Sequence, residues 1–120
     1  MTHERLGFHI LRLGLATLFL WFGFSQLVDG LSWVAWVPSW AVVLFNLPPA
    51  MLVLLNGLAE VLLGSLLALG LWVRPVALIL GFHLFIITLE IGATAIGVRD
   101  FGLTAATFAL ALLVPAKPKV

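Results

Sequence analysis

Residues 49–71 read PAMLVLLNGLAEVLLGSLLALGL, an apolar run in which Glu60 is the only ionisable residue. A helix that crosses a bilayer needs roughly 20 mainly apolar residues, and this run is long enough. Pro48 and Pro49 mark its start, because proline interrupts a preceding helix but fits the first turn of the next one. The stretch Pro49–Leu71 therefore predicts a membrane-spanning helix with one buried carboxyl group.

Three other stretches have a similar composition: Leu6–Val28, Pro75–Ala95 and the shorter Val98–Val114. Turn and helix-stop residues separate the stretches, because proline, glycine and aspartate interrupt helices; these are Asp29-Gly30, Pro38, Arg74-Pro75 and Pro115. The chain is therefore predicted to be all-α, an integral membrane four-helix transmembrane bundle that forms one domain over residues 1–120.

The overall composition agrees with a bilayer environment. Of the 120 residues, 63% are hydrophobic and only 9% are charged, which is more apolar side chain than one small domain could hide from water. The net charge of +1 comes from scattered residues, so no basic patch for nucleic acid exists. There are no cysteines, which excludes disulfide exchange, thiolate catalysis and iron–sulfur ligation.

The stretch Leu31–Leu47 differs from the four spans because it is shorter and carries Trp33, Trp36 and Trp40 around Pro38. Indole rings prefer the boundary between membrane and water. We therefore expect an interfacial segment between the first two spans, which either only anchors this connection or forms a lid over a binding cavity.

The basic residues predict the orientation of the bundle. With an even number of spans, five of them fall on one side, Arg5, Arg12, Arg74, Lys117 and Lys119, and Arg99 lies near the other. Basic residues favour the cytoplasmic side of a membrane. This predicts a multi-pass protein of a prokaryotic cytoplasmic or inner membrane with both termini in the cytoplasm.

Each predicted span carries one polar or small-residue stripe at helical spacing, and these stripes should face one another inside the bundle. Helical rise places Arg12, Asn56, Glu60 and His83 at depths where they could meet near the middle of the membrane. We predict these four as ligand-binding residues. The structural alternatives are a buried ion pair between Glu60 and Arg12 and a packing role for His83.

A second group of polar residues is expected nearer the outer surface. Gln26, Glu90, Arg99 and Asp100 form this predicted outer polar cluster, with Asp29 close by, and Arg99 could neutralise a carboxylate. Asp100 could instead cap the last helix, because a carboxylate accepts from free N–H groups at a helix start. The spacing of histidine and glutamate within single helices does not indicate a metal site.

Several short motifs resemble the DoxX family. They are Arg12, Phe22-Gly23-Phe24-x-Gln26-Leu27, Gly57-Leu58-Ala59-Glu60 with Gly64, Gly70-x-x-x-Arg74 and Arg99-Asp100. The resemblance implies a four-span inner-membrane protein of bacteria or archaea, similar to the small subunit of an archaeal thiosulfate:quinone oxidoreductase and to members linked to oxidative stress. Gln26 departs from the lysine that the family often has at this position.

Three functions follow as hypotheses, and the residues define no catalytic group. The first is an oxidoreductase-associated auxiliary subunit whose bundle holds a quinone or another lipophilic ligand. The second is a membrane anchor or interaction subunit, with a redox partner subunit or a second copy of the chain as its partner. The third is a small proton-coupled carrier, although four spans are few for alternating access without oligomerisation.

Overall fold

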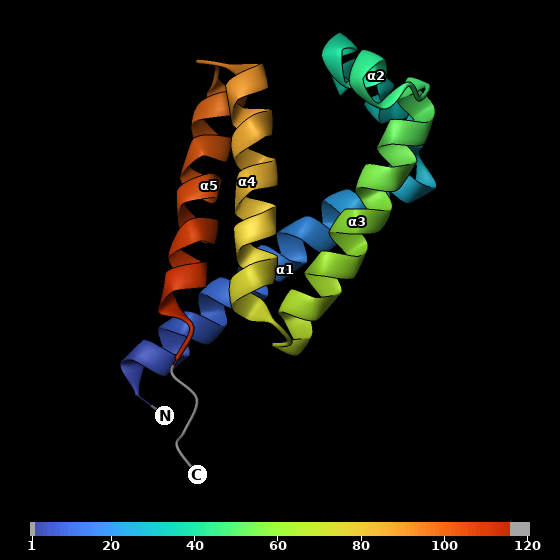
Figure 1. Ribbon diagram of the computed structural model, residues 1–120. Coiled ribbons are helices and arrows are strands. Elements are labelled where there is room, and N and C mark those ends of the chain that lie inside the picture. The colour runs from blue at the N-terminus through green and yellow to red at the C-terminus, as the bar shows by residue number, and fades with distance from the viewer. Residues whose placement is uncertain (1, 116–120) are drawn as a thin grey trace.

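Four long helices make up most of the chain in the computed structural model, which describes residues 2–115 (Figure 1). They are α1 (His3–Val28), α3 (Pro49–Leu69), α4 (Val73–Ile91) and α5 (Ala95–Leu113). Each of the four is long and apolar enough to cross a membrane. The predicted all-α bundle with four spans is therefore confirmed.

The helices α3 and α4 end earlier than predicted because a glycine with positive φ follows each of them. Gly70 has φ 76° and returns its N–H to the carbonyls of Leu66 and Leu67, so α3 stops at Leu69. Gly92 has φ 78° and ends α4. Side chains other than glycine rarely adopt such angles, which makes glycine the usual residue at this kind of helix end.

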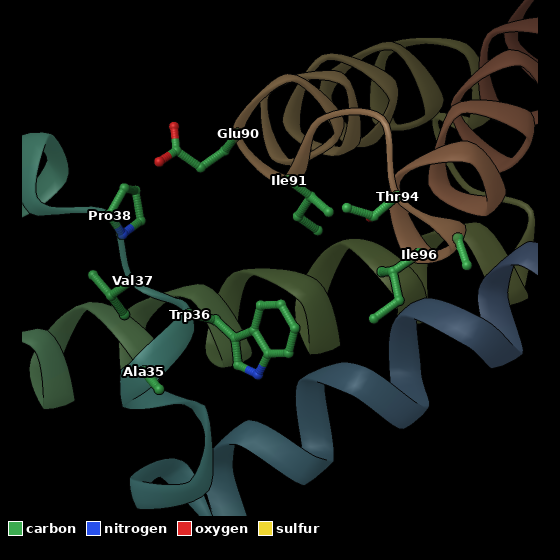
Figure 2. Close-up of a pocket in the computed structure, with 9 residues that line it drawn as sticks. Ala35, Trp36, Val37, Pro38, Glu90, Ile91, Thr94 and Ile96 are labelled. Atoms are coloured by element: carbon green, nitrogen blue, oxygen red, sulfur yellow. The ribbon is translucent and has the colours of Figure 1, made fainter.

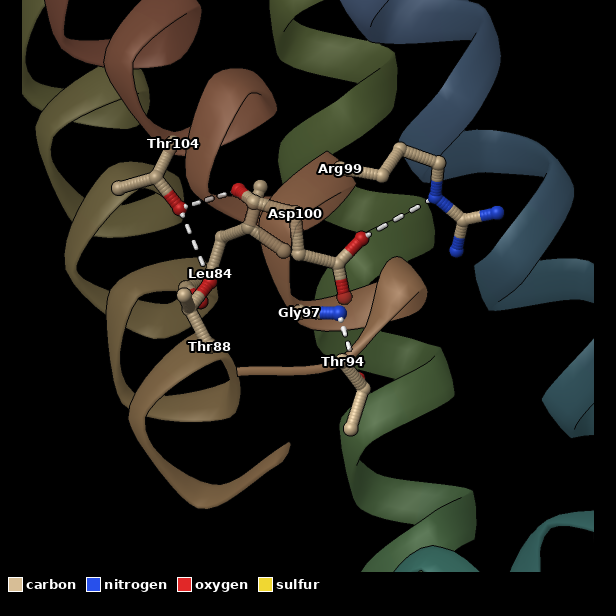
Figure 3. Close-up of polar contacts among 7 residues, drawn as sticks. All are labelled: Leu84, Thr88, Thr94, Gly97, Arg99, Asp100 and Thr104. Atoms are coloured by element: carbon tan, nitrogen blue, oxygen red, sulfur yellow. Dashed lines mark hydrogen bonds and ion pairs between the residues drawn. The ribbon is translucent and has the colours of Figure 1, made fainter. Parts of the chain in front are cut away.

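The last helix begins earlier than predicted, at Ala95. Its first turn is capped by Thr94, whose hydroxyl accepts a hydrogen bond of 3.0 Å from the backbone N–H of Gly97 (Figure 3). The expectation that Asp100 caps this helix was therefore wrong. Threonine caps a helix in the same way as aspartate, through a side-chain oxygen. Asp100 lies one turn farther along α5, where it is buried.

The four helices form two pairs, α1 with α3 and α4 with α5. Both described chain ends and the turn between α3 and α4 lie at one end of the molecule, here called the terminal end (Figure 1). The connection between α1 and α3 and the turn between α4 and α5 lie at the other, the loop end. The two pairs meet toward the terminal end and diverge toward the loop end.

The α1–α3 pair is held together by a close approach of two backbones. A Cβ atom added to Gly57 would lie 2.9 Å from the carbonyl oxygen of Gly23, and one added to Gly23 would lie 2.9 Å from the carbonyl oxygen of Gly57. Small residues allow such contacts between helices in a membrane, where packing rather than water exclusion drives association. The crossing point of this pair is thus set by two reciprocal glycines.

The apolar core lies where the two pairs meet. Its fully or nearly fully buried side chains come from all four long helices, and they include Phe19, Leu67, Leu80 and Leu110. Farther along the α4–α5 pair, Gly81 makes room for the ring of Phe108. The core therefore fixes the terminal half of the bundle and leaves the loop end more open.

The connection between α1 and α3 consists of two short helices, η1 (Gly30–Trp36) and α2 (Ser39–Phe45). No residue of either is buried, and Leu31 and Val43 are each at least 80% exposed. Trp33 ties η1 to α1, because its Nε1–H donates to the Ser25 hydroxyl over 3.1 Å. The segment predicted to be interfacial is thus a helical strap with apolar side chains on its surface.

Candidate functional site

Arg12 serves the end of a neighbouring helix. Its Nη1 donates to the carbonyl oxygens of Leu67 and Ala68, over 2.7 and 2.6 Å, and its Nη2 lies 3.3 Å from Nδ1 of His9. The last carbonyls of a helix have no partner within the helix, and a cation is favourable there. The structure does not bring Arg12 to Glu60, so the expected meeting of these two residues was wrong.

Arg74 does the same for the second helix pair. From the first turn of α4 its Nε donates to the carbonyl oxygen of Ala111 over 3.0 Å, and its Nη2 lies 3.5 Å from that of Val114. Sequence reasoning used Arg74 only as a turn marker and a sign of orientation. The sequence signal was a single basic residue at the start of a spanning helix, but only the structure shows that the C-terminus of α5 lies beside it.

Asn56 meets Gln26 near the loop end of the α1–α3 pair. The Asn56 amide donates to Oε1 of Gln26 over 2.7 Å, and Gln26 itself is buried. This side-chain bond crosses from α3 to α1 close to the glycine contact. It provides both residues with a partner inside the bundle, as buried polar groups in a membrane require.

The buried polar residues of the α4–α5 pair are also mostly paired. Figure 3 shows the Thr104 hydroxyl between the carbonyl oxygen of Asp100, 2.8 Å away, and the Thr88 hydroxyl, 3.3 Å away. The Asp100 carboxylate lies 3.5 Å from Nε of Arg99, the residue that the sequence offered as its counter-charge. The Thr88–Thr104 contact joins α4 to α5, the other two lie within α5, and together they leave little polar capacity for a ligand.

The predicted outer polar cluster does not form a single group. Gln26 bonds to Asn56, Arg99 lies against Asp100, and Glu90 accepts from Nε1 of Trp40 over 3.0 Å. The four residues do lie toward the loop end, as expected from helical rise. They separate because Gln26 belongs to the α1–α3 pair, Arg99 and Asp100 belong to the α4–α5 pair, and Glu90 contacts the strap.

Glu60 and His83 are different, because part of their bonding capacity is unused. Oε1 of Glu60 lies 3.4 Å from Nε2 of His83, an ion-pair distance without hydrogen-bond geometry. Oε2 of Glu60 and Nε2 of His83 are shielded from the surface and have no hydrogen-bond partner. Glu60 as a whole is only 5% exposed. This is the one predicted pair of site residues that the structure brings together while leaving it unsatisfied within the described chain.

The position of this pair suits a group dissolved in the membrane. Glu60 lies near the middle of α3 and His83 near the middle of α4, which puts both near half the height of the bundle. The His83 ring is about one third exposed, 34%, at the side of the bundle, while its Nε2 is shielded. An imidazole N–H and a carboxylate oxygen together can donate to one ligand atom and accept from another.

A cleft of about 630 Å³ opens at the loop end, between the strap and the turn from α4 to α5. Figure 2 shows Trp36 and Pro38 on one side of it and Glu90, Ile91 and Thr94 on the other. Its volume is within the range of small-molecule sites, roughly 300–1,000 Å³. The sequence predicted Glu90 as a polar residue of this region and offered, as one alternative for Leu31–Leu47, a lid over a binding cavity, but it did not place Glu90 beside that segment.

The fold and the arrangement of its polar residues define a class of protein, a multi-pass membrane protein whose four spanning helices form two pairs. The chain belongs to the DoxX family, whose family model matches residues 7–93. The match covers most of α1 and all of α3 and α4, and it ends before α5, so the Arg99-Asp100 motif lies outside it. Neither the curated proteins nor the solved structures gave a match.

Proposed function

We propose that this DoxX-family protein is an auxiliary subunit of a membrane redox system and that it binds a quinone, or a similar lipophilic carbonyl compound, between α3 and α4. The observation that carries the proposal is the pair Glu60–His83, in which two buried polar atoms lack hydrogen-bond partners near the middle of the bundle. The resemblance to membrane redox subunits indicates the class of ligand.

The chemistry of the pair is complementary to both redox forms of a quinone. The His83 imidazole can donate to a quinone carbonyl, and the Glu60 carboxylate can accept from the hydroxyl of a quinol. A buried donor or acceptor left without a partner costs about 1–3 kcal/mol, and that cost is relieved when a ligand supplies the partner. Arg12 and Asn56 already have protein partners, so we assign the ligand contacts to Glu60 and His83.

The orientation of the protein in the membrane is part of the same proposal. Arg5, Arg12 and Arg74 lie on the part of the chain near the terminal end, and Arg99 lies toward the loop end. Lys117 and Lys119 lie outside the described residues. The positive-inside tendency then supports a cytoplasmic terminal end in a prokaryotic inner membrane.

A direct binding measurement tests this proposal. The purified protein in detergent is titrated with a short-chain quinone, and quenching of its tryptophan fluorescence or equilibrium dialysis gives Kd. We expect Glu60→Gln to weaken binding about tenfold, the factor that corresponds to roughly 1.4 kcal/mol, because a carboxylate is a stronger acceptor than an amide. His83→Phe, which removes the donor but keeps a ring, should weaken binding similarly.

The matched control is Thr107→Val. Thr107 is fully buried like Glu60, but its hydroxyl bonds only to the carbonyl oxygen of Leu103 in its own helix. This variant should bind quinone as the wild type does. Equal affinity of the wild type and Glu60→Gln, with both proteins folded by circular dichroism and size exclusion, would show that the pair is not a ligand site.

The interaction subunit remains a second candidate because of one observation on the strap. The short helix α2 buries none of its residues, and Leu44 and Phe45 are 68% and 58% exposed. Affinity purification from native membranes tests this function. A stoichiometric protein partner that is lost on Leu44→Ser with Phe45→Ser, and no bound quinone, would favour it over the ligand-binding subunit.

A further inference from the structure

The cleft at the loop end has an uneven lining. Apart from Glu90 and Thr94, the residues around it are apolar, namely Ala35, Trp36, Val37, Pro38, Ile91, Ala95 and Ile96. The cleft lies at the loop end, beside the two connections between helices. Because spanning helices end near the polar headgroups, we expect the headgroups of the bilayer at this level. An occupant that fits this lining has an apolar body and a small polar group.

The charge of that polar group follows from Glu90. Its Oε2 accepts from Nε1 of Trp40, and no basic side chain among the described residues lies within 4 Å of either carboxylate oxygen. Arg99, the arginine at the loop end of the molecule, lies against Asp100 instead. Glu90 is therefore an exposed carboxylate on the wall of an apolar cleft, and no cation of residues 2–115 lies beside it.

The indole ring of Trp36 is a second feature of the cleft that favours a cationic group. Figure 2 shows the indole of Trp36 on the opposite side of the cleft from Glu90, with the space between them open. The face of an indole ring attracts a positive charge, and tryptophan is the most effective aromatic residue in this respect. A headgroup whose only charge is negative would be repelled by Glu90, whereas a headgroup with an ammonium group can place that cation beside the carboxylate.

We propose that this cleft binds the headgroup of a membrane lipid that carries a primary ammonium group. The ammonium donates to Glu90 and lies toward the Trp36 ring, and the start of the acyl chains covers the apolar residues of the cleft. A lipid is the occupant because most of the lining is apolar and the cleft opens at the expected headgroup level. This site is separate from the Glu60–His83 pair and does not depend on the quinone proposal.

Native mass spectrometry of the delipidated protein in detergent, with lipid added back, tests this site. Phosphatidylethanolamine should give a one-to-one adduct with a Kd about tenfold lower than that of phosphatidylglycerol with the same acyl chains. Glu90→Gln should raise the Kd for phosphatidylethanolamine about tenfold, since it removes the charge but keeps an oxygen that can accept from Trp40. Soluble phosphoethanolamine should compete only weakly, because it lacks the acyl chains.

Two control variants separate this site from other effects. Glu4→Gln removes an exposed carboxylate at the terminal end and should leave both lipid affinities unchanged. Glu60→Gln should weaken quinone binding and leave phosphatidylethanolamine binding unchanged. Glu90→Gln should weaken phosphatidylethanolamine binding and leave quinone binding unchanged. Equal binding of the two lipids by the wild type, or an unchanged Kd in Glu90→Gln, would overturn the proposal whether or not quinone binds.

Discussion

Gly57→Ala is expected to lower the free energy of unfolding by about 1–3 kcal/mol, the usual cost of overpacking a well-packed core. The added methyl group would lie 2.9 Å from the backbone carbonyl oxygen of Gly23 and 2.9 Å from Cβ of Gln26. Neither atom can move unless the two helices separate. Gly23→Ala should have a similar effect, because its methyl group meets the backbone of Gly57 and Val61. Thermal or denaturant unfolding in detergent, followed by tryptophan fluorescence, measures the loss.

The chain provides a graded set of controls for this prediction. At Gly64 the nearest atoms, 3.1–3.3 Å away, belong to the flexible Leu20 side chain, so Gly64→Ala should cost less. At Gly14 nothing lies within 4 Å, and Gly14→Ala should be neutral or slightly stabilising because alanine favours the helix. Equal stability of the Gly14→Ala and Gly57→Ala proteins would contradict the close crossing of α1 and α3.

Arg12→Met is expected to destabilise the protein by about 2 kcal/mol. The substitution keeps an unbranched side chain but removes two hydrogen bonds from a charged group to the end of α3. Bonds between helices in membranes often contribute less than this, but here the donor is charged and both acceptors are helix-end carbonyls. Unfolding under the same conditions as for the glycine variants measures the effect, and quinone affinity of the folded fraction should stay unchanged.

Two further arginine variants serve as controls. Arg12→Lys should recover part of the stability, because an ammonium can reach one of the two carbonyls but lacks the forked geometry of guanidinium. Arg5→Gln should be neutral, since only the backbone of Arg5 takes part in a hydrogen bond among the described residues, and its side chain is exposed. A loss of quinone affinity in Arg12→Met, without a loss of stability, would return Arg12 to the ligand site.

The number and type of the main elements could be predicted because they depend on local composition. Apolar runs of sufficient length specify spanning helices, and the shorter tryptophan-rich stretch between the first two is set apart from them by its length and composition. The helix ends were less accessible to prediction. Gly70 and Gly92 end their helices through backbone angles, and Thr94 rather than Asp100 caps α5. Composition predicted these boundaries at Leu71, Ala95 and Val98, and the backbone geometry places them at Leu69, Ile91 and Ala95.

The candidate site was predictable in its residues and depth but only partly in its contacts. Helical periodicity correctly placed Glu60 and His83 at similar depth on facing stripes, and they lie 3.4 Å apart. It also grouped Arg12 with them, because a helix pattern does not show how far a long side chain reaches or which helices are neighbours. The pairing of α1 with α3 takes Arg12 to a helix end and Gln26 to Asn56.

Most polar side chains between the described helices therefore have a structural explanation. Arg12 and Arg74 bond to helix-end carbonyls, Gln26 bonds to Asn56, and the buried threonines of the α4–α5 pair bond to one another or to the backbone. The Glu60–His83 pair stands apart because, although the two side chains lie at ion-pair distance, Oε2 of Glu60 and Nε2 of His83 are buried without a hydrogen-bond partner. That contrast supports a ligand at this pair over a purely structural role.

The most direct test is a native mass spectrum of the protein released gently from its own membranes. The proposal predicts an adduct with the mass of a quinone on the wild type, and its loss from Glu60→Gln but not from Thr107→Val. A spectrum with a stoichiometric protein partner and no quinone-mass adduct on the wild type would contradict it. The protein would then be an assembly subunit, with the Glu60–His83 pair holding two helices in register.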